Sequence, residues 1–478
     1  MLTALVTLAA TIAAAQQPDV PLDTSTALRP SRYALDVRVD LAQKRLDAEA
    51  QLTAVNRSGA AVHSASLLLY RLMRVTDVYD ARGTPLPFRE RVVEFLDHPT
   101  FQVRQVVVSL PKPLSPGDST TLRIRYGGYL VGYAETGWGY LHDRIDSAYT
   151  LIRMDTYAYP ELRPPSHAIG RRAGLPTYDY YARVTVPAGY VVANGGALLS
   201  QRDSAGWTTF EFRNLKPSWR MDFAVAPFVV RQQGALRVYQ LPADSLGGAR
   251  VMRSLERGMQ LFTRWFGPLH GQSSFTLIEI PDGWGSQADV TSILETAAAF
   301  HDSLSAHEIY HELSHLWNVP ATDSMPPRWE EGLASFLEDL AADSLDGRTI
   351  TDKNAQWLVE RLRERAARNR RLSEVAPIDY GGHEMTDNSY SVGGVMFYTM
   401  YGVMGHDAFT RLVRDYYATY ASTGGSVADF MSMAKRMSPV RLDVLFADWL
   451  QSARWTSVIA TTNARELVSR YRSAIGKP

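Results

Sequence analysis

The sequence of 478 residues contains no cysteine. Disulfide frameworks, thiol nucleophiles and cysteine-ligated metal sites are therefore excluded together. A transition metal bound by this chain must be held by His, Asp or Glu side chains. A lipid anchor attached to an N-terminal cysteine is excluded for the same reason.

The chain also lacks a net charge, because 50 Lys and Arg residues balance 50 Asp and Glu residues. This balance disfavours nucleic acid as a partner, since no overall field attracts a polyanion. No stretch reaches the roughly 18 uninterrupted apolar residues of a membrane-spanning helix. With 45% hydrophobic and 21% charged residues, the sequence predicts a globular protein of two domains without an integral membrane span.

The N-terminal residues resemble an export signal. Residues 3–15 read TALVTLAATIAAA, a short apolar stretch that ends in small residues. We interpret residues 1–15 as a signal peptide cleaved after Ala15, which predicts a periplasmic or extracellular protein. Because no Lys or Arg precedes the stretch, an uncleaved N-terminal helix is the alternative.

Residues 28–232 alternate apolar and polar side chains. The segment RYALDVRVDL (32–41) places Tyr33, Leu35 and Val37 on one face, and similar alternation returns in segments up to MDFAVAPF (221–228). This period of two, with Gly and Pro between the segments, is typical of half-buried antiparallel strands. We therefore expect an N-terminal antiparallel β-sheet domain.

In residues 233–478 the apolar side chains recur with a helical period. Apolar residues from Val251 to Phe266 recur at steps of three or four, and residues 275–281 form the last predicted strand before helices dominate from Ser303 onward. Ser426 and Asp429 predict a capping box at the start of a helix over 427–437. The second domain is expected to be helix-rich α+β, with a firm interface to the first.

A histidine cluster carries the chemistry. His307, His311 and His315 recur every four residues, so one helix would place them along one stripe. They create two overlapping H-E-x-x-H motifs, in which two imidazoles bind zinc and the intervening Glu308 or Glu312 can take a proton from water. A third ligand is required, and the next predicted helix, RWEEGLASFLEDL (328–340), supplies carboxylates on its polar face.

The sequence HELSHLW followed by RWEEGLASFLE resembles the paired motifs of gluzincin metallopeptidases of the aminopeptidase N (membrane alanyl aminopeptidase) family. The resemblance spans nearly the whole chain after residue 15, and it implies a thermolysin-like catalytic domain behind the β domain. It implies one zinc ion per chain, held by His311, His315 and Glu331. It further implies Glu312 as the general base and Glu338 as a carboxylate that orients a zinc-binding histidine.

Further along the chain, Tyr390 resembles the tyrosine of that family that donates a hydrogen bond to the tetrahedral oxyanion, although Val392 replaces the usual lysine. The spacing also departs from the pattern. Fifteen residues, 316–330, separate His315 from Glu331, where the family has about eighteen. The alternative register of His307, Glu308, His311 and Glu330 meets that spacing. In that register, however, Trp317 and Gly332 do not stand where the family's motifs have a tryptophan and a glycine.

The region that binds the substrate amine in aminopeptidases differs as well. Where that family has G-x-M-E-N, this chain has GWGSQADVTSILE (283–295), with Gln287 near the expected glutamate. Asp289 and Glu295 are alternative anionic anchors. Because few residues follow ADWLQSARW (447–455), we expect this protein to lack the large C-terminal helical domain of that family.

The function predicted from the sequence is an exported zinc metallopeptidase acting on peptides or proteins, with an aminopeptidase as the first interpretation. An endopeptidase or oligopeptidase is the alternative within enzymes. A peptide-binding protein without catalysis is the alternative outside them. The oligomeric state is left open.

Overall fold

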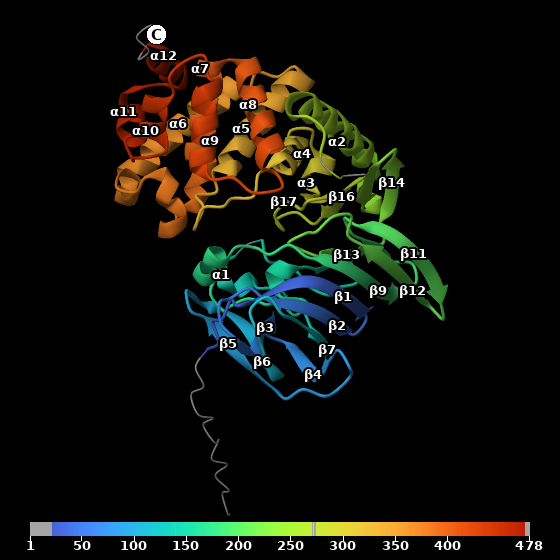
Figure 1. Cartoon of the computed structure of the whole chain (residues 1–478). Coiled ribbons are helices and arrows are strands. Elements are labelled where there is room, and N and C mark those ends of the chain that lie inside the picture. Colours follow the sequence, from blue (N-terminus) through green and yellow to red (C-terminus); the bar gives the residue numbers. More distant parts are fainter. Residues whose placement is uncertain (1–21, 139, 270, 272–273, 474–478) are drawn as a thin grey trace, which may run out of the picture.

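A computed structural model describes residues 22–138, 140–269, 271 and 274–473. The chain forms a β-sheet domain followed by a helix-rich domain, in the predicted order (Figure 1). The predicted signal peptide, residues 1–15, lies outside the described residues, so export stays a prediction.

The first domain is built on a seven-stranded sheet with the strand order β11-β12-β9-β1-β2-β7-β4. Neighbouring strands run antiparallel as expected, except that β1 and β9 pair in parallel. The apolar side chains of the first strand alternate as predicted, since Tyr33, Leu35 and Val37 are all buried. The strands are β1 (Leu28–Asp40), β2 (Arg45–Asn56), β4 (Met73–Asp80), β7 (Ser119–Tyr129), β9 (Asp179–Pro187), β11 (Ala197–Ser204) and β12 (Trp207–Arg213).

Two three-stranded sheets and a short helix complete this domain. Their orders are β3-β6-β5 and β10-β13-β8. Their buried side chains share one hydrophobic core with the large sheet. These elements are β3 (Val62–Tyr70), β5 (Phe88–Phe95), β6 (His98–Leu114), β8 (Thr150–Ile152), α1 (His167–Ala173), β10 (Val191–Ala193) and β13 (Phe223–Ala226).

The second domain begins with a mixed five-stranded sheet in the order β14-β15-β16-β18-β17. The strands are β14 (Val229–Gln233), β15 (Leu236–Gln240), β16 (Phe275–Ile280), β17 (Gln287–Ala288) and β18 (Ser292–Thr296). Because β14 already belongs to this sheet, the chain changes sheets between 226 and 229, a few residues before the expected boundary at 232. The alternating pattern runs through this change, so periodicity could not locate it.

The remaining elements of the second domain are helices. The amphipathic face of α2 is buried as predicted, and α9 begins with the capping box of Ser426 and Asp429. The helices are α2 (Ser245–Phe266), α3 (Ala298–His301), α4 (Glu308–Ser314), α5 (Trp329–Asp346), α6 (Thr351–Arg368), α7 (Ser389–Met404), α8 (His406–Tyr420), α9 (Val427–Met437), α10 (Asp443–Trp449), α11 (Trp455–Thr461) and α12 (Ala464–Ser473).

The two domains share a buried apolar interface. Side chains from both, among them Leu151 and Phe228 on one side and Ile278 and Trp284 on the other, form one cluster. The hydroxyl of Tyr149 also donates a hydrogen bond of 2.7 Å to the backbone oxygen of Glu279. This interface places β16, β17 and β18 of the second domain directly against the first.

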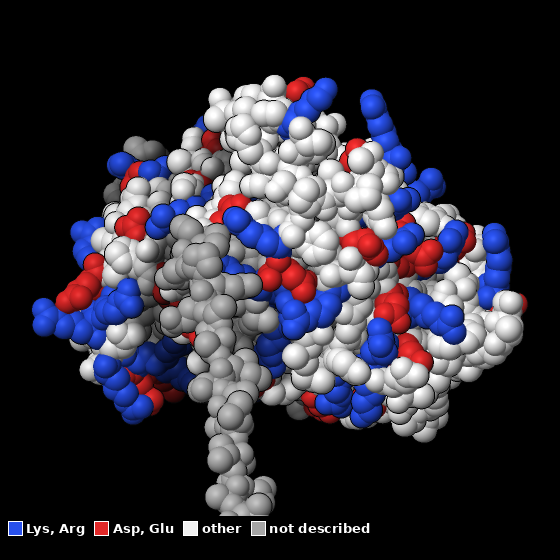
Figure 2. All heavy atoms as spheres, turned by 90° about the horizontal axis from the view of Figure 1, so that it is seen from below, with Lys and Arg blue, Asp and Glu red and all other residues white. Residues whose placement is uncertain are grey.

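Figure 2 shows Lys and Arg side chains interspersed with Asp and Glu over the face seen from below, with no large area of one sign. Among the described helices, none combines the length and apolar character needed to cross a bilayer.

Candidate metal centre

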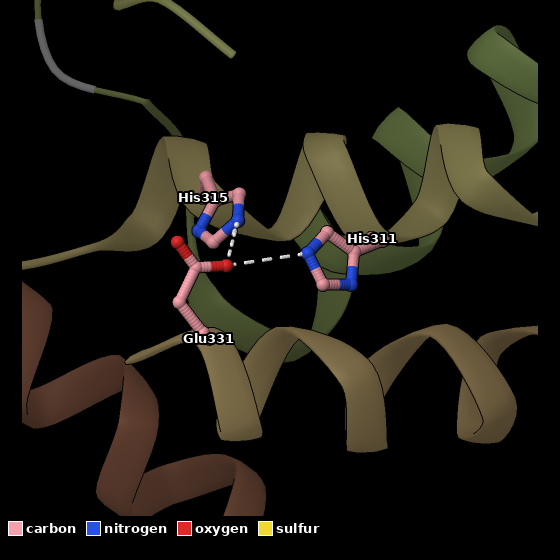
Figure 3. Close-up of side chains that lie close together, drawn as sticks. All are labelled: His311, His315 and Glu331. Atoms are coloured by element: carbon pink, nitrogen blue, oxygen red, sulfur yellow. Dashed lines mark ion pairs between the residues drawn. The ribbon is translucent and has the colours of Figure 1, made fainter. Parts of the chain in front are cut away.

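Three predicted ligands converge between α4 and α5. His311 lies on α4, His315 begins the 3-10 turn that continues it, and Glu331 lies in the first turn of α5. Oε2 of Glu331 is 3.5 Å from Nε2 of His311 and 3.4 Å from Nε2 of His315 (Figure 3). Ligand atoms of the three side chains lie within 4.8 Å of one another, which is close enough to surround one ion.

The start of α5 fixes the carboxylate. Arg328 precedes the helix in the left-handed conformation, with φ of 57°, and its guanidinium pairs with Oε1 of Glu331. Burial alone would raise the pKa of Glu331, but hydrogen bonds to the two imidazoles and the charge of Arg328 lower it well below its usual range. The carboxylate is therefore ionised and oriented.

Each imidazole has a partner for its other ring nitrogen. Nδ1 of His311 lies 3.5 Å from Oε2 of Glu338, and Nδ1 of His315 lies 2.8 Å from the side-chain amide of Asn318. The Glu338 carboxylate can hold a proton at Nδ1 of His311, which leaves the Nε2 lone pair of that ring for a metal, whereas the Asn318 amide fixes the orientation of the His315 ring. Glu338 is the carboxylate that the resemblance implies for this position, whereas no motif pointed to Asn318.

The donor set fits a zinc ion. Two imidazoles and one carboxylate are the protein ligands of one class of catalytic zinc site, in which the fourth position accepts water or substrate. Nε2 of His311, Nε2 of His315 and Oε2 of Glu331 point toward one another. Among the described residues, this is the one group of three or more such side chains close enough to hold an ion.

Glu312 follows the first ligand and is buried. Burial raises its pKa, outweighing the two neighbouring imidazoles that lower it. Two further acidic side chains lie nearby: Glu295 of β18 is fully buried and accepts a 3.1 Å hydrogen bond from Ser286, and burial also raises the pKa of Glu308. A carboxyl group whose pKa is raised in such a site is better suited to accept a proton than one with an ordinary pKa.

Tyr390 lies against the ligands from the side of α7. Its ring is parallel to that of His311, with centroids 6.2 Å apart and an interplanar angle of 6°. The Arg328 guanidinium lies 5.9 Å from the centre of the Tyr390 ring. Burial and the negative charge of Glu331 raise the pKa of the phenol, so it keeps its proton and can donate it in a hydrogen bond.

The residues of the alternative register do not converge on one point. His307 lies in a 3-10 turn before α4, and its Nε2 is 3.4 Å from Asp346 at the far end of α5. Neither His307 nor Glu330 belongs to the convergent group of the described residues. The three histidines do not share one continuous α-helical stripe, because α4 begins only at Glu308 and gives way to a 3-10 turn at His315.

Gln287, the expected contact for a substrate amine, lies on the edge strand β17. Its Oε1 accepts hydrogen bonds from Nη1 of Arg153, at 3.1 Å, and from Nη2 of Arg220, at 2.7 Å. Both arginines come from the first domain. An oxygen with two guanidinium partners has no acceptor site left for an ammonium group.

Comparison with known proteins establishes the fold. No model of a known protein family matches the sequence, and no curated protein sequence matches it. Solved structures do match: the M1 zinc metallopeptidase of Deinococcus radiodurans, as a glutamate-to-alanine variant bound to a Tyr-Ser-Ala substrate, aligns with a TM-score of 0.64 at 20% identity. That alignment covers 90% of this chain and 95% of the other.

Two related structures give the same result. The M1 zinc metallopeptidase of Deinococcus radiodurans without that substitution aligns with a TM-score of 0.62 at 20% identity, over 91% of this chain and 96% of the other. A two-domain M1 zinc metallopeptidase variant bound to L-arginine aligns with a TM-score of 0.59 at 20% identity, over 92% and 96%. The chain thus has the two-domain fold of these metallopeptidases.

Proposed function

We propose that this protein is a zinc-dependent metallopeptidase that hydrolyses peptide bonds with one zinc ion per chain. The observation that carries the proposal is the convergence of His311, His315 and Glu331, with Glu312 and Tyr390 beside them. The fold shared with M1 zinc metallopeptidases supports the same activity. Bound zinc supplies Lewis-acid activation of a water molecule and of the scissile carbonyl group.

Glu312 acts as the general base in this proposal. Its carboxylate takes a proton from the attacking water and delivers it to the nitrogen of the leaving amine. Its burial beside the ligands keeps it out of contact with bulk water and raises its pKa, which favours uptake of that proton. The oxygen that attacks the carbonyl carbon comes from water, so no covalent enzyme intermediate is needed.

Tyr390 stabilises the charge that develops during the attack. Its phenol is protonated and lies beside His311 and Glu331. A donor placed there binds the oxyanion of the tetrahedral intermediate more strongly than the neutral carbonyl, and so lowers the activation barrier.

Two modes of cleavage fit a zinc peptidase site of this kind. The resemblance in sequence favours an aminopeptidase, which needs an acceptor for the free amino terminus. The occupied oxygen of Gln287 instead supports an endopeptidase or oligopeptidase. Export to the periplasm or beyond is part of the proposal, and it rests on residues 1–15 alone.

Removal and return of the metal test the proposed activity. The purified protein is treated with a chelator, dialysed and incubated with a peptide library, and the products are identified by mass spectrometry. We expect cleavage to stop without metal and to return with one equivalent of Zn²⁺ per chain. Cleavage that persists in metal-free protein contradicts the proposal. Stoichiometric zinc without cleavage of any peptide supports the non-catalytic binding protein instead.

A further inference from the structure

We propose that Gln287 presents its amide N–H group to a carbonyl oxygen of the substrate. The protein then acts on peptides that continue, or carry an acyl group, on the N-terminal side of the cleaved residue. A peptide whose free amino terminus begins at that residue would be a poor substrate. This inference rests on the proposed peptidase function and names its substrate class.

The orientation of the Gln287 amide is dictated by its partners. Arg153 and Arg220 offer only donors, so the atom that faces both of them must be the carbonyl oxygen. The NH₂ group then points away from the two guanidinium groups. Within the described residues, the hydrogen bonds of the Gln287 side chain are the two at its Oε1, and the side chain is half-buried. The Gln287 side chain can therefore offer a ligand the hydrogen-bond donor of its NH₂ group.

The two arginines are themselves held firmly. The side chain of Arg153 is 0% exposed, and it donates to Asp143 at 2.7 Å and to the backbone oxygen of Tyr140 at 2.9 Å. The side chain of Arg220 is 2% exposed, and it donates to Asp155 at 2.8 Å. Rotating the Gln287 amide would set NH₂ against two buried cations, which makes the donor orientation the stable one.

Three carboxylates lie around β17, and each has an internal partner. Asp155 pairs with the buried arginines, Asp289 accepts a 2.6 Å hydrogen bond from Ser218, and Glu295 is fully buried and accepts from Ser286. Asp155 and Asp289 are thus not open anchors for an ammonium group, and Oε2 of Glu295, which has no partner among the described residues, is closed off by the complete burial of that side chain.

The donor lies near the proposed metal centre. Strand β17 packs against α4, the helix that carries His311, and Figure 1 shows β17 at the junction of the two domains. Ser286, the neighbour of Gln287, reaches Glu295 next to the general base. A substrate extended along this edge strand can present a backbone carbonyl to Gln287. An N-acetyl group supplies the same acceptor.

The test compares two octapeptides of one sequence, one with a free and one with an acetylated amino terminus, and uses the zinc-loaded full-length protein. We expect cleavage of both at the same internal bonds, with kcat/KM for the acetylated peptide equal or higher. Stepwise release of the N-terminal residue, abolished by acetylation, overturns this inference and leaves the peptidase proposal intact. If neither peptide is cut, the peptidase proposal fails and this inference fails with it.

The variant Gln287→Glu tests the residue itself. A glutamate is nearly isosteric and is neutralised by the two arginines, but it replaces the NH₂ donor with an acceptor. We expect kcat/KM for the acetylated peptide to fall about 10-fold, the effect of one lost hydrogen bond, mainly through KM. The same change at the exposed Gln201 is the matched control and should have no effect. Unchanged kinetics in Gln287→Glu contradict the proposed contact.

Discussion

Gly332 and Gly393 lie in backbone contact where α5 crosses α7. A methyl group on Gly332 would come within 2.5 Å of Cα of Gly393 and within 2.6 Å of the backbone oxygen of Ser389. Glu331 precedes Gly332, and Tyr390 follows Ser389. The close approach of the two helices is thus what brings the third ligand and the phenol together.

The variant Gly332→Ala should therefore push α5 away from α7. Overpacking at a helix crossing of this kind costs about 1–3 kcal/mol of unfolding free energy. We expect a lower midpoint in thermal unfolding and weaker zinc binding in equilibrium dialysis. Gly382→Ala is the control, because a methyl group there meets no atom within 4 Å. Equal stability and zinc affinity of the two variants would disprove this role for the crossing.

The variant Tyr390→Phe should keep the bound metal and have a lower kcat. Removal of one oxyanion donor costs about 100-fold in kcat, because the hydrogen bond forms fully only in the transition state. We expect KM and zinc content to stay close to those of the wild type. Tyr398→Phe on the same helix, whose hydroxyl donates to Asp352 on α6, is the control. A normal kcat in Tyr390→Phe would remove the phenol from the mechanism.

Replacement of single histidines separates the two motif registers. His307→Ala should retain one zinc per chain and near-normal hydrolysis, because its imidazole faces Asp346 rather than the ligands. His315→Ala should lose tightly bound zinc and activity, because it removes one of three ligands. Zinc content by mass spectrometry of the native protein distinguishes the two. The reverse pattern would assign the site to His307, Glu308, His311 and Glu330.

The stability of the fold should decrease in mild acid because of His167. Burial between aromatic rings, aided by nearby arginines, lowers its pKa to about 4, from about 6.5 when unfolded. Between these values the unfolded chain binds more protons, so the free energy of unfolding rises with pH and falls as the pH drops. Urea unfolding at pH 7 and pH 5 measures this loss.

His167→Phe keeps a ring at that position and removes the titrating group. Its loss of stability between pH 7 and pH 5 should be smaller than that of the wild type. Replacement of the exposed His63 by Gln should leave the wild-type loss unchanged. If His167→Phe loses as much stability as the wild type, another group causes the acid sensitivity.

Local signals in the sequence predicted much of the fold. The alternation around Tyr33 predicted β1, and the capping box of Ser426 and Asp429 predicted α9 with its observed bounds. The spacing of the histidines and the acidic face of the next helix indicated a metal site, and the resemblance to the paired motifs singled out the group that the structure brings together. These features depend on residues within a few turns or strands of one another, which is why they can be read from the sequence.

Features that depend on distant parts of the chain could not be predicted. The partners of Gln287 are Arg153 and Arg220, which lie 134 and 67 residues away in the sequence. Arg328 contacts Glu331 from the left-handed conformation, which arginine rarely adopts and no motif announces. The parallel pairing of β1 with β9 joins strands far apart in the chain, and alternation within a strand does not reveal its neighbours.

The central claim is that His311, His315 and Glu331 hold a zinc ion whose chemistry requires Glu312 as the base. The most direct measurement compares zinc content and peptide hydrolysis of the wild type and Glu312→Gln. We predict one zinc per chain in both proteins and a loss of about 100-fold or more in kcat for the variant. Equal hydrolysis by the two proteins, at equal zinc content, would contradict the account.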